Sequence, residues 1–347
     1  MRVRIVGSGL IGTSIGLASR AQFWQVVMID SELENARLAQ DLVGDPFEGE
    51  PDLVVLALPT SRMALVANME FQMNPKTIFM DVGSVKTNPQ VEIDSIPGLA
   101  RRFCGTHPIA GREIGGPAAA RADLFDGRPW IYTPSKATDP DVLEKVQMVI
   151  ATFGAIPIQM EVAEHDRAVA LLSHLPQISS SLLAAQIVGA RPEWLSLAGQ
   201  GLRDSTRIAR SDPKLWREIL SMNRAEIRPL LVALSEELLE LIADFDDEDS
   251  IERFIAKGRA GIEAIPGKHG GKAREYSYLP IVIEDKAGQL GSLFQECAHA
   301  QVNIEDLSIE HSPGQFTGLI TLALSKSDGE KLSTHLIHKG WKVHALR

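Results

Sequence analysis

The sequence predicts a doubly wound α/β domain, then an all-α domain, then a small α+β domain. Three observations predict this order. Strand-like runs first alternate with helical spacing, strand signals become scarce from about residue 161, and they return near residue 278 in the order βαββαβ. The predicted domains are 1–160, 161–265 and 278–347, with a linker rich in glycine and cations at 266–277. A chain of 347 residues is long enough for two or three domains.

The first domain opens with strands and helices in alternation. Apolar runs predict strands at 2–6, 25–29, 52–59 and 77–83, and apolar residues at helical spacing predict a helix at 10–21. The run DLVVLALP at 52–59 is almost continuously apolar, as expected of a strand that is buried on both faces. Strands that alternate with helices predict a parallel sheet.

The second domain is predicted to be helical because apolar residues recur every three or four positions in three segments, 163–190, 212–245 and 249–265. Asp212 followed by Pro213 is suited to an N-cap and a first helical residue. The apolar stripes fit either a homodimer interface or a core. In the last domain we expect strands at 278–285, 304–312, 316–325 and the final WKVHAL, and helices at 288–301 and 329–340.

The composition limits the possible partners. A net charge of −10 without a basic stripe argues against a nucleic-acid partner. The two cysteines, Cys104 and Cys297, lie far apart without a CxxC spacing, which indicates a reducing compartment and no thiolate metal site. We expect no metal. No apolar run approaches the roughly 18 residues of a membrane span, so a cytoplasmic protein without a membrane partner is expected.

A glycine-rich turn predicts the cofactor. GSGLIG places Gly7, Gly9 and Gly12 between a strand and a helix, the context of a dinucleotide-binding fingerprint. Free N–H groups at the helix start favour phosphates, so Leu10 and Ile11 are also expected to contact the cofactor. Asp30 ends the second strand, where a carboxylate accepts hydrogen bonds from both ribose hydroxyls and favours NAD over NADP. The alternative for this residue is a solvated strand end. Backbone near the cofactor is also expected at Pro59 and Thr60.

A second motif, CGTHPIAGREIGG, suggests the chemistry. A neutral imidazole at His107 is suited to accept a proton while hydride leaves for a nicotinamide. The histidine follows a short apolar stretch near the expected carboxyl edge of the sheet, and Pro108 holds it in an extended conformation. Ser84, in DVGSVK, follows another strand and can orient the imidazole. The alternative is a polar loop in which His107 has a structural role.

Four motifs in order carry a family resemblance: DVGSVK, THPIAGRE, SHLPQ and RDSTRIARSDPKLW. Together they resemble the TyrA family, the prephenate and arogenate dehydrogenases of tyrosine biosynthesis, over nearly the whole chain. The resemblance implies NAD-dependent oxidative decarboxylation of prephenate to 4-hydroxyphenylpyruvate, with release of CO2 and NADH. An arogenate dehydrogenase is the alternative within this family. A catalytically silent sensor of NAD and an amino acid is the alternative outside it.

The resemblance also implies roles for single residues. His107 matches the histidine that takes the proton of the ring hydroxyl, and Ser84 matches the serine that positions this histidine beside the nicotinamide. Arg207 matches an arginine that binds a substrate carboxylate, for which a planar two-pronged donor is well suited. His174 matches a histidine of the substrate pocket, and Glu113 an acidic residue near the pocket mouth.

The chain departs from the family pattern at Gln177. Many prephenate-specific members have a second histidine there, and glutamine cannot become cationic, which keeps arogenate open as a substrate. Arg203 shares a face with Arg207 if this stretch is helical, and its alternative is a solvated surface arginine. His165, in EHD, is expected on a helix surface outside the site.

The last domain resembles an ACT domain through EDKAGQLGSLFQ and VNIEDLSI. ACT domains commonly pair and bind amino acids between copies. The resemblance implies a homodimer that is feedback-inhibited by tyrosine, and the expected effector residues are Asp285, Gly288, Gln289, Asn303 and Ile304. The alternative is a module that serves dimerisation alone.

Overall fold

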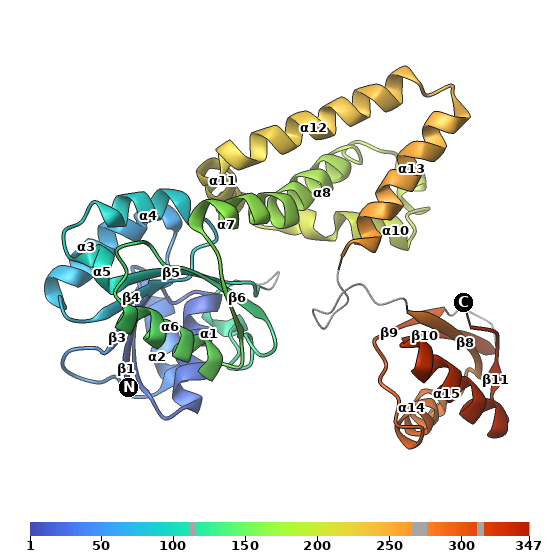
Figure 1. The fold of residues 1–347 in the computed structure, drawn as a ribbon, viewed down its shortest axis with the longest axis horizontal. Coiled ribbons are helices and arrows are strands. Elements are labelled where there is room, and N and C mark those ends of the chain that lie inside the picture. Colours follow the sequence, from blue (N-terminus) through green and yellow to red (C-terminus); the bar gives the residue numbers. More distant parts are fainter. Residues whose placement is uncertain (112–114, 266–275, 311–315, 347) are drawn as a thin grey trace. The chain divides into compact units, whose positions relative to one another are not determined.

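The computed structural model describes residues 1–111, 115–265, 276–310 and 316–346. It divides into two compact units, Met1–Glu237 and Leu238–Arg347, and each is described by itself (Figure 1). Glu113 and most of the predicted linker lie outside the described residues.

The first unit contains a seven-stranded sheet in the order β2-β1-β3-β4-β5-β6-β7. The strands expected near residues 2–6, 25–29, 52–59 and 77–83 are all present. The strands are β1 (Arg2–Val6), β2 (Gln25–Ile29), β3 (Leu53–Leu56), β4 (Ile78–Asp81), β5 (Phe103–Pro108), β6 (Pro129–Thr133) and β7 (Ile156–Gln159).

The sheet is parallel except where β6 pairs antiparallel with β5, so the expectation of a wholly parallel sheet is wrong there. A parallel neighbour needs a crossover, which is usually a helix. The described residues between β5 and β6 contain only the short 3-10 helix Pro117–Ala119. The pair β6 and β7 is parallel again, because α6 (Pro140–Thr152) connects them.

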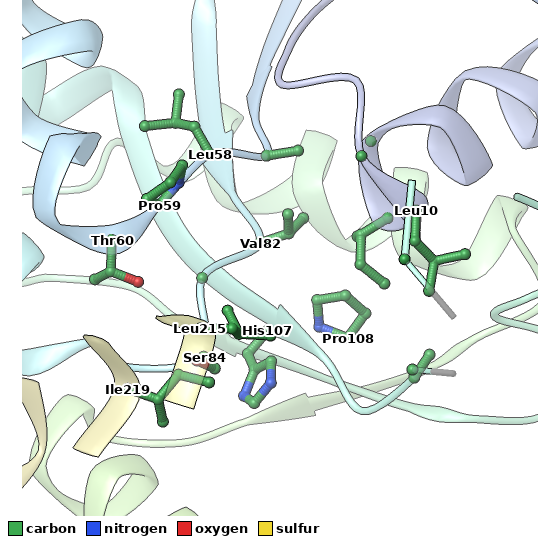
Figure 2. Close-up of a pocket in the computed structure, with 18 of the residues that line it drawn as sticks. Leu10, Leu58, Pro59, Thr60, Val82, Ser84, His107, Pro108, Leu215 and Ile219 are labelled. Carbon is green, nitrogen blue, oxygen red and sulfur yellow. The ribbon is translucent and has the colours of Figure 1, made fainter. Parts of the chain in front are cut away.

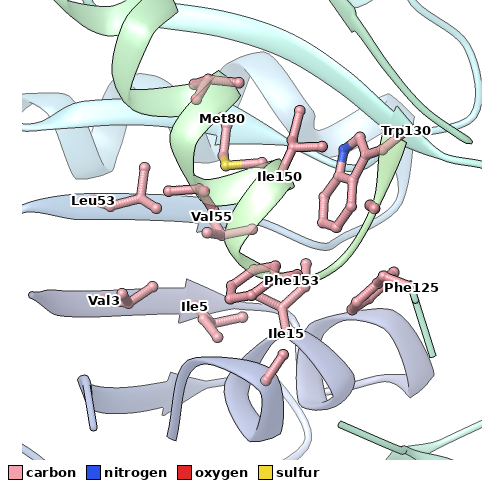
Figure 3. Close-up of a cluster of buried hydrophobic side chains, with 14 of the residues drawn as sticks. Val3, Ile5, Ile15, Leu53, Val55, Met80, Phe125, Trp130, Ile150 and Phe153 are labelled. Carbon is pink, nitrogen blue, oxygen red and sulfur yellow. The ribbon is translucent and has the colours of Figure 1, made fainter. Parts of the chain in front are cut away.

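Helices cover both faces of this sheet, and successive residues of β3 point to opposite faces. Leu53 and Val55 pack in a core with α1 (Leu10–Ala21), α2 (Leu33–Val43) and α6, part of which is drawn in Figure 3. On the other face, Val54 and Leu56 share a core with α3 (Met63–Met73), α4 (Thr87–Asp94) and α5 (Leu99–Arg102). Burial on both sides explains the continuous apolar run.

The strand order reverses at β1, because β2 pairs on one side of it and β3 on the other. In open α/β sheets, ligands bind outside the carboxyl ends of the strands at such a reversal. The fold therefore places the glycine-rich turn, which follows β1, at the expected ligand position.

Helices follow the sheet, as the apolar spacing predicts. They are α7 (Val162–Val169), a π-helical turn (Ala170–His174), α8 (Leu175–Ala185), α9 (Pro192–Leu195), α10 (Gln200–Thr206), a 3-10 turn (Arg207–Arg210), α11 (Pro213–Met222), α12 (Arg224–Ala243) and α13 (Glu248–Glu263). The segment 212–245 forms two helices that meet at Asn223. The predicted N-cap is confirmed, because an Asp212 carboxylate oxygen accepts a hydrogen bond from the Lys214 N–H at 2.9 Å.

By length and composition alone, the helical run Val162–Ala185 is able to cross a membrane, which the sequence analysis did not anticipate. Core helices of water-soluble proteins satisfy the same criteria. This run carries the buried polar side chains His165, Asp166 and His174, which bond to residues of other segments in the same unit. Such contacts are those of a helix packed within a domain.

The C-terminal part has the expected βαββαβ order. Its elements are β8 (Ser277–Glu284), α14 (Gln289–His299), β9 (Asp306–Glu310), β10 (Thr317–Leu324), α15 (Lys326–His338) and β11 (Lys342–Val343). The strands form an antiparallel sheet in the order β11-β8-β10-β9. Leu293 of α14 and Leu336 of α15 share one core with Ile281 of β8, so both helices cover the same face.

Candidate active site

The glycine-rich turn after β1 is closely packed at two of its three glycines. Gly7 has a φ of +107°, and a Cβ there would lie 1.9 Å from the Ala57 carbonyl oxygen. A Cβ on Gly12 would lie 2.0 Å from the Gly7 carbonyl oxygen. A Cβ on Gly9 would meet no described atom within 4 Å, so this position leaves the backbone open to a ligand. The arrangement fits a pyrophosphate beside the turn.

The start of α1 and the end of β2 complete this cradle. Among the described residues, no side chain caps α1, so its first N–H groups remain directed toward an anion. Asp30 lies beside the turn, where its carboxylate accepts hydrogen bonds from the Ser8 N–H at 2.6 Å and the Glu32 N–H at 2.9 Å. This places a carboxylate where the ribose of a dinucleotide is expected.

A cavity of about 470 Å³ opens beside the turn (Figure 2). It brings together eight of the residues predicted for the cofactor site and the chemistry: Gly9, Leu10, Ile11, Gly12, Pro59, Thr60, Ser84 and His107. They come from the ends of β1, β3, β4 and β5, so the cavity follows the carboxyl edge of the sheet.

Three further residues of the cavity wall, to which the sequence assigned no role, come from a single helix. Leu215, Glu218 and Ile219 lie on α11, where their spacing puts them on one face of the helix. A Glu218 carboxylate oxygen accepts a hydrogen bond from the Ser61 N–H at 2.9 Å. This bond fixes α11 against the turn that follows β3. The spacing of these residues by three and four positions was the signal in the sequence that could have placed them on one face of the helix.

His107 contacts a second histidine that the sequence analysis placed outside the site. Its Nδ1 lies 2.9 Å from Nε2 of His165, and His165 Nδ1 lies 2.8 Å from a carboxylate oxygen of Asp166. The expectation that His165 lies on a helix surface is wrong, because its side chain has no exposed area. Helix α7 buries this polar face against the end of the sheet, where each polar atom finds a partner.

Asp166 also joins α7 to the start of α4. Its two carboxylate oxygens accept hydrogen bonds from the Lys86 and Thr87 N–H groups, each at 2.8 Å. Burial opposes ionisation of this carboxyl, but the hydrogen bonds from His165, Thr87 and the Lys86 backbone hold its pKa below the ordinary value. Asp166 is therefore ionised at neutral pH.

A buried ion pair stabilises the strand ends beside His107. The Lys86 ammonium pairs with the Asp81 carboxylate and donates to the Thr106 carbonyl oxygen at 2.7 Å. Asp81 also accepts hydrogen bonds from the Thr106 N–H at 2.9 Å and the Gly83 N–H at 2.8 Å. This network ties the loop that carries Ser84 to the strand residue just before His107. No role for Lys86 follows from the sequence alone.

The environment keeps His107 neutral. Burial lowers its pKa well below the ordinary value, and the nearby His165, Lys86 and His174 lower it further, whereas Asp166 opposes them. Ser84 lines the same cavity beside His107 (Figure 2), but within the described residues it makes no hydrogen bond to the imidazole. The predicted orienting role of Ser84 stays a prediction.

Other predicted substrate residues lie away from the cavity wall. His174 is buried, and its Nδ1 lies 3.1 Å from Nδ2 of Asn223; burial lowers its pKa to about 4. Gln177 donates to the Ile208 carbonyl oxygen at 3.0 Å and accepts from the Ser211 hydroxyl at 3.3 Å. Its amide thus holds the 3-10 turn after α10.

The two predicted arginines are exposed. Arg203 lies on α10, and Arg207 begins the 3-10 turn that the Gln177 amide holds. Neither side chain lines the cavity. Within the described residues, no group of three histidine, cysteine or acidic side chains gathers closely enough to hold a metal ion.

The fold and the site define a dinucleotide-dependent oxidoreductase, with a Rossmann domain followed by a helical domain. Comparison with known proteins then identifies the family. Residues 16–159 match the family model of the prephenate dehydrogenase nucleotide-binding domain, and residues 161–256 match that of the prephenate dehydrogenase dimerization domain. A protein of Streptomyces niveus described as a probable prephenate dehydrogenase is 30% identical over 98% of this chain and 99% of its own. The chain belongs to the prephenate dehydrogenase family.

Solved structures agree with this assignment. Prephenate dehydrogenase from A. aeolicus, in complex with hydroxyphenyl propionate and NAD+, is 27% identical with a TM-score of 0.68, over 76% of this chain and 98% of its own. Synechocystis arogenate dehydrogenase is 25% identical with a TM-score of 0.62, over 76% of this chain and 99% of its own. The Rossmann-like domain and the mostly helical second domain are thus those of the family.

Proposed function

We propose that the chain is an NAD-dependent prephenate dehydrogenase, which converts prephenate to 4-hydroxyphenylpyruvate, CO2 and NADH. One observation carries the proposal within the family: the neutral imidazole of His107 shares a cavity with the open side of the glycine-rich turn. A proton acceptor and a nicotinamide site lie side by side in such a cavity. The position of Asp30 favours NAD over NADP.

The reaction assigns one task to His107. NAD, when bound beside the glycine-rich turn, would supply the acceptor for the hydride of the carbon that bears the ring hydroxyl. Because His165 occupies Nδ1 of His107, Nε2 is the nitrogen that takes the hydroxyl proton. Loss of CO2 leaves its bonding electrons in the ring, which becomes aromatic, and the proton returns from Nε2 to the phenol oxygen. The imidazole ends the cycle neutral, and no net proton is released.

The family resemblance assigns substrate binding to Arg207, and also to Arg203, His174, Gln177 and Glu113, of which Glu113 lies outside the described residues. The hydrogen bond from the Gln177 amide to the Ile208 carbonyl also supports these roles, since it fixes the turn on which Arg207 lies. An arginine on this turn presents a guanidinium, which is suited to a carboxylate of the dianionic substrate.

The second candidate is arogenate dehydrogenase. It is favoured by Gln177, which replaces the second histidine of many prephenate-specific members, and by the similarity to the Synechocystis arogenate dehydrogenase. We would measure NADH formation by absorbance, with NAD and equal concentrations of prephenate or arogenate, and repeat it with NADP. Turnover mainly with prephenate and NAD supports the proposal, whereas preference for arogenate favours the alternative. NAD binding without turnover of either substrate favours the sensor hypothesis.

We further propose that the C-terminal βαββαβ domain is an ACT domain that binds tyrosine. Gly288 supports this, because it has a φ of +89° and is the N-cap residue just before α14, as a tight turn into the first helix requires. The effector site comprises Asp285, Gly288, Gln289, Asn303 and Ile304. Added tyrosine is expected to inhibit the full chain. Unchanged turnover across physiological tyrosine concentrations leaves dimerisation as the role of this domain.

A homodimer in the cytoplasm completes the proposal. The match to a dimerization domain and the exposed apolar side chains on α8, such as Leu182 and Leu183, support the dimer. Cys104 and Cys297 are both free and buried, which suits a reducing compartment. Sedimentation of the full chain tests the oligomeric state, and a monomer at micromolar concentration contradicts this part of the proposal.

A further inference from the structure

Three polar side chains form a continuous line that ends at the cavity. Asp166 contacts His165, His165 contacts His107, and both contacts are shorter than 3 Å, at 2.8 and 2.9 Å. Asp166 and His165 are buried almost completely, so water does not compete for these atoms. Only His107, at the end of the line, reaches the cavity wall.

The position of each proton in this line follows from Asp166. Its carboxylate is ionised and acts only as an acceptor, because the Lys86 and Thr87 N–H groups already donate to it. His165 must therefore carry a proton on Nδ1, which leaves its Nε2 as the acceptor that faces Nδ1 of His107. That acceptor requires a proton on Nδ1 of His107. Nε2 of His107 is then left bare, and it is the nitrogen that remains available to a substrate in the cavity that His107 lines.

We propose that Asp166 and His165 are positioning residues that fix the tautomer of His107, so that Nε2 is always the nitrogen that accepts the substrate proton. This inference rests on the proposed function, since it assumes a proton on the ring hydroxyl of the substrate. In serine proteases a carboxylate likewise sets the tautomer of a catalytic histidine, and there its replacement by an amide lowers kcat by about 10⁴-fold. Here a second imidazole stands between the carboxylate and the base.

The line also stabilises the cation that His107 becomes during turnover. Among the described residues, the charged and titratable groups that face it are His165 and Asp166 on α7, His174 on the π-helical turn, and Lys86 before α4. Asp166 is the anion among them, and Asp81 neutralises Lys86. Removing the Asp166 charge is therefore expected to lower the pKa of His107.

The main test compares two substitutions of His165. Leucine removes the acceptor of the His107 Nδ1 proton, whereas glutamine retains a carbonyl oxygen for it. We expect His165→Leu to lower kcat by about 10²-fold or more, with KM for the substrate and NAD binding changed little, and His165→Gln to recover at least tenfold of this loss. Wild-type kcat in His165→Leu, or equal losses in both variants, overturns the proposal.

A second test needs neither substrate nor cofactor. ¹⁵N NMR of the imidazole nitrogens of the wild-type full chain reports which nitrogen of His107 carries the proton. We expect a proton on Nδ1 in the wild type, and a mixture of tautomers in His165→Leu. A proton on Nε2 of wild-type His107 contradicts the proposal, even if the His165 variants fold poorly.

Asp166→Asn tests the charge, with Glu70→Gln as its matched control. Glu70 is a buried carboxylate that Arg4 holds with two hydrogen bonds, at 2.8 and 3.0 Å. It lies outside the histidine cluster, by which we mean His107, His165 and Asp166. We expect Asp166→Asn to lower kcat and to move the acid limb of the kcat/KM profile to lower pH, whereas Glu70→Gln lowers the Tm alone. An unshifted profile in Asp166→Asn contradicts the charge role. If the wild type turns over neither prephenate nor arogenate, the proposed function fails, while the NMR result still decides the tautomer.

Discussion

The turn that holds the cofactor consists of consecutive residues, Gly7–Gly12, whereas the histidine cluster joins segments that are 58 and 80 positions apart in the chain. The turn works through backbone shape, since a Cβ at either end of it would strike a carbonyl oxygen. The cluster works through side-chain hydrogen bonds that exist only once α7 has packed against the sheet. Cofactor binding is therefore encoded locally, while the proton chemistry depends on the whole domain.

The largest expected effect separates these two regions by function. His107→Asn removes the proton acceptor and leaves the glycine-rich turn unchanged. We expect kcat to fall by about 10²–10⁴-fold, the usual range for a general base, with NAD affinity nearly unchanged. Steady-state kinetics and NAD titration by fluorescence measure the two quantities. Near-normal turnover would refute the role of His107.

The next largest effect is expected on substrate affinity, which depends on neither the glycine-rich turn nor the histidine cluster. Arg207→Ala removes a charged, two-pronged donor, which is worth roughly 1.5–3 kcal/mol. We expect the KM for prephenate to rise by about 10–10²-fold and kcat to change less, as for the loss of uniform binding. Initial rates over a wide prephenate range check this. An unchanged KM would move the carboxylate site elsewhere.

Two alanine substitutions within the turn sharpen the comparison. In Gly7→Ala the new Cβ meets the Ala57 carbonyl at 1.9 Å and φ is +107°, so the fold itself is strained, by about 1–3 kcal/mol from the dihedral angle alone. In Gly9→Ala the Cβ meets no described atom, so we expect an unchanged Tm and a NAD affinity weakened by about tenfold. Thermal unfolding and NAD titration of both variants distinguish them. Equal Tm losses would contradict the different roles of the two glycines.

A last expected effect, on stability rather than on activity, is the pH dependence that His174 contributes. Its folded pKa of about 4 lies below the ordinary 6.5, so the unfolded chain takes up the proton first as the pH falls. The contribution is complete above pH 6.5 and is lost between pH 6.5 and 4, which amounts to about 2 kcal/mol between pH 7 and 5. Urea unfolding at both pH values, for the wild type and His174→Asn, measures it. An equally steep loss in the variant assigns the effect to other groups.

Features that depend on neighbouring residues are predicted from the sequence, whereas features that depend on distant residues are missed. Strands β1 to β4 and helix α1 follow from local periodicity, and the glycine spacing alone locates the cofactor turn. The direction of β6 is missed, because it depends on how the chain returns between β5 and β6 rather than on the residues of the strand. The ACT assignment and the effector residues stay predictions.

His165 shows why the cluster is out of reach of pattern analysis. Its neighbours Glu164, Asp166 and Arg167 suggest a face of α7 that is exposed to water. In the structure His165 and Asp166 are buried, because their polar atoms bond to His107 and to the start of α4. A single sequence shows polarity but not which distant groups will satisfy it. For the same reason, the sequence does not reveal that Glu218 bonds to the Ser61 N–H and lines the cavity.

The π-helical turn Ala170–His174 determines how α8, which follows it directly, is rotated about the helix axis relative to α7. Nine residues of a regular α-helix would place His174 about 180° around the axis from His165. A wide turn takes up about one additional residue, which reduces this angle to about 80° and lets both histidines approach the Asp166–Asn223 region. Deleting one residue here would rotate α8 by about 100°, carrying Gln177 away from Ile208. We therefore expect a one-residue deletion to be tolerated far less well here than in the middle of α8.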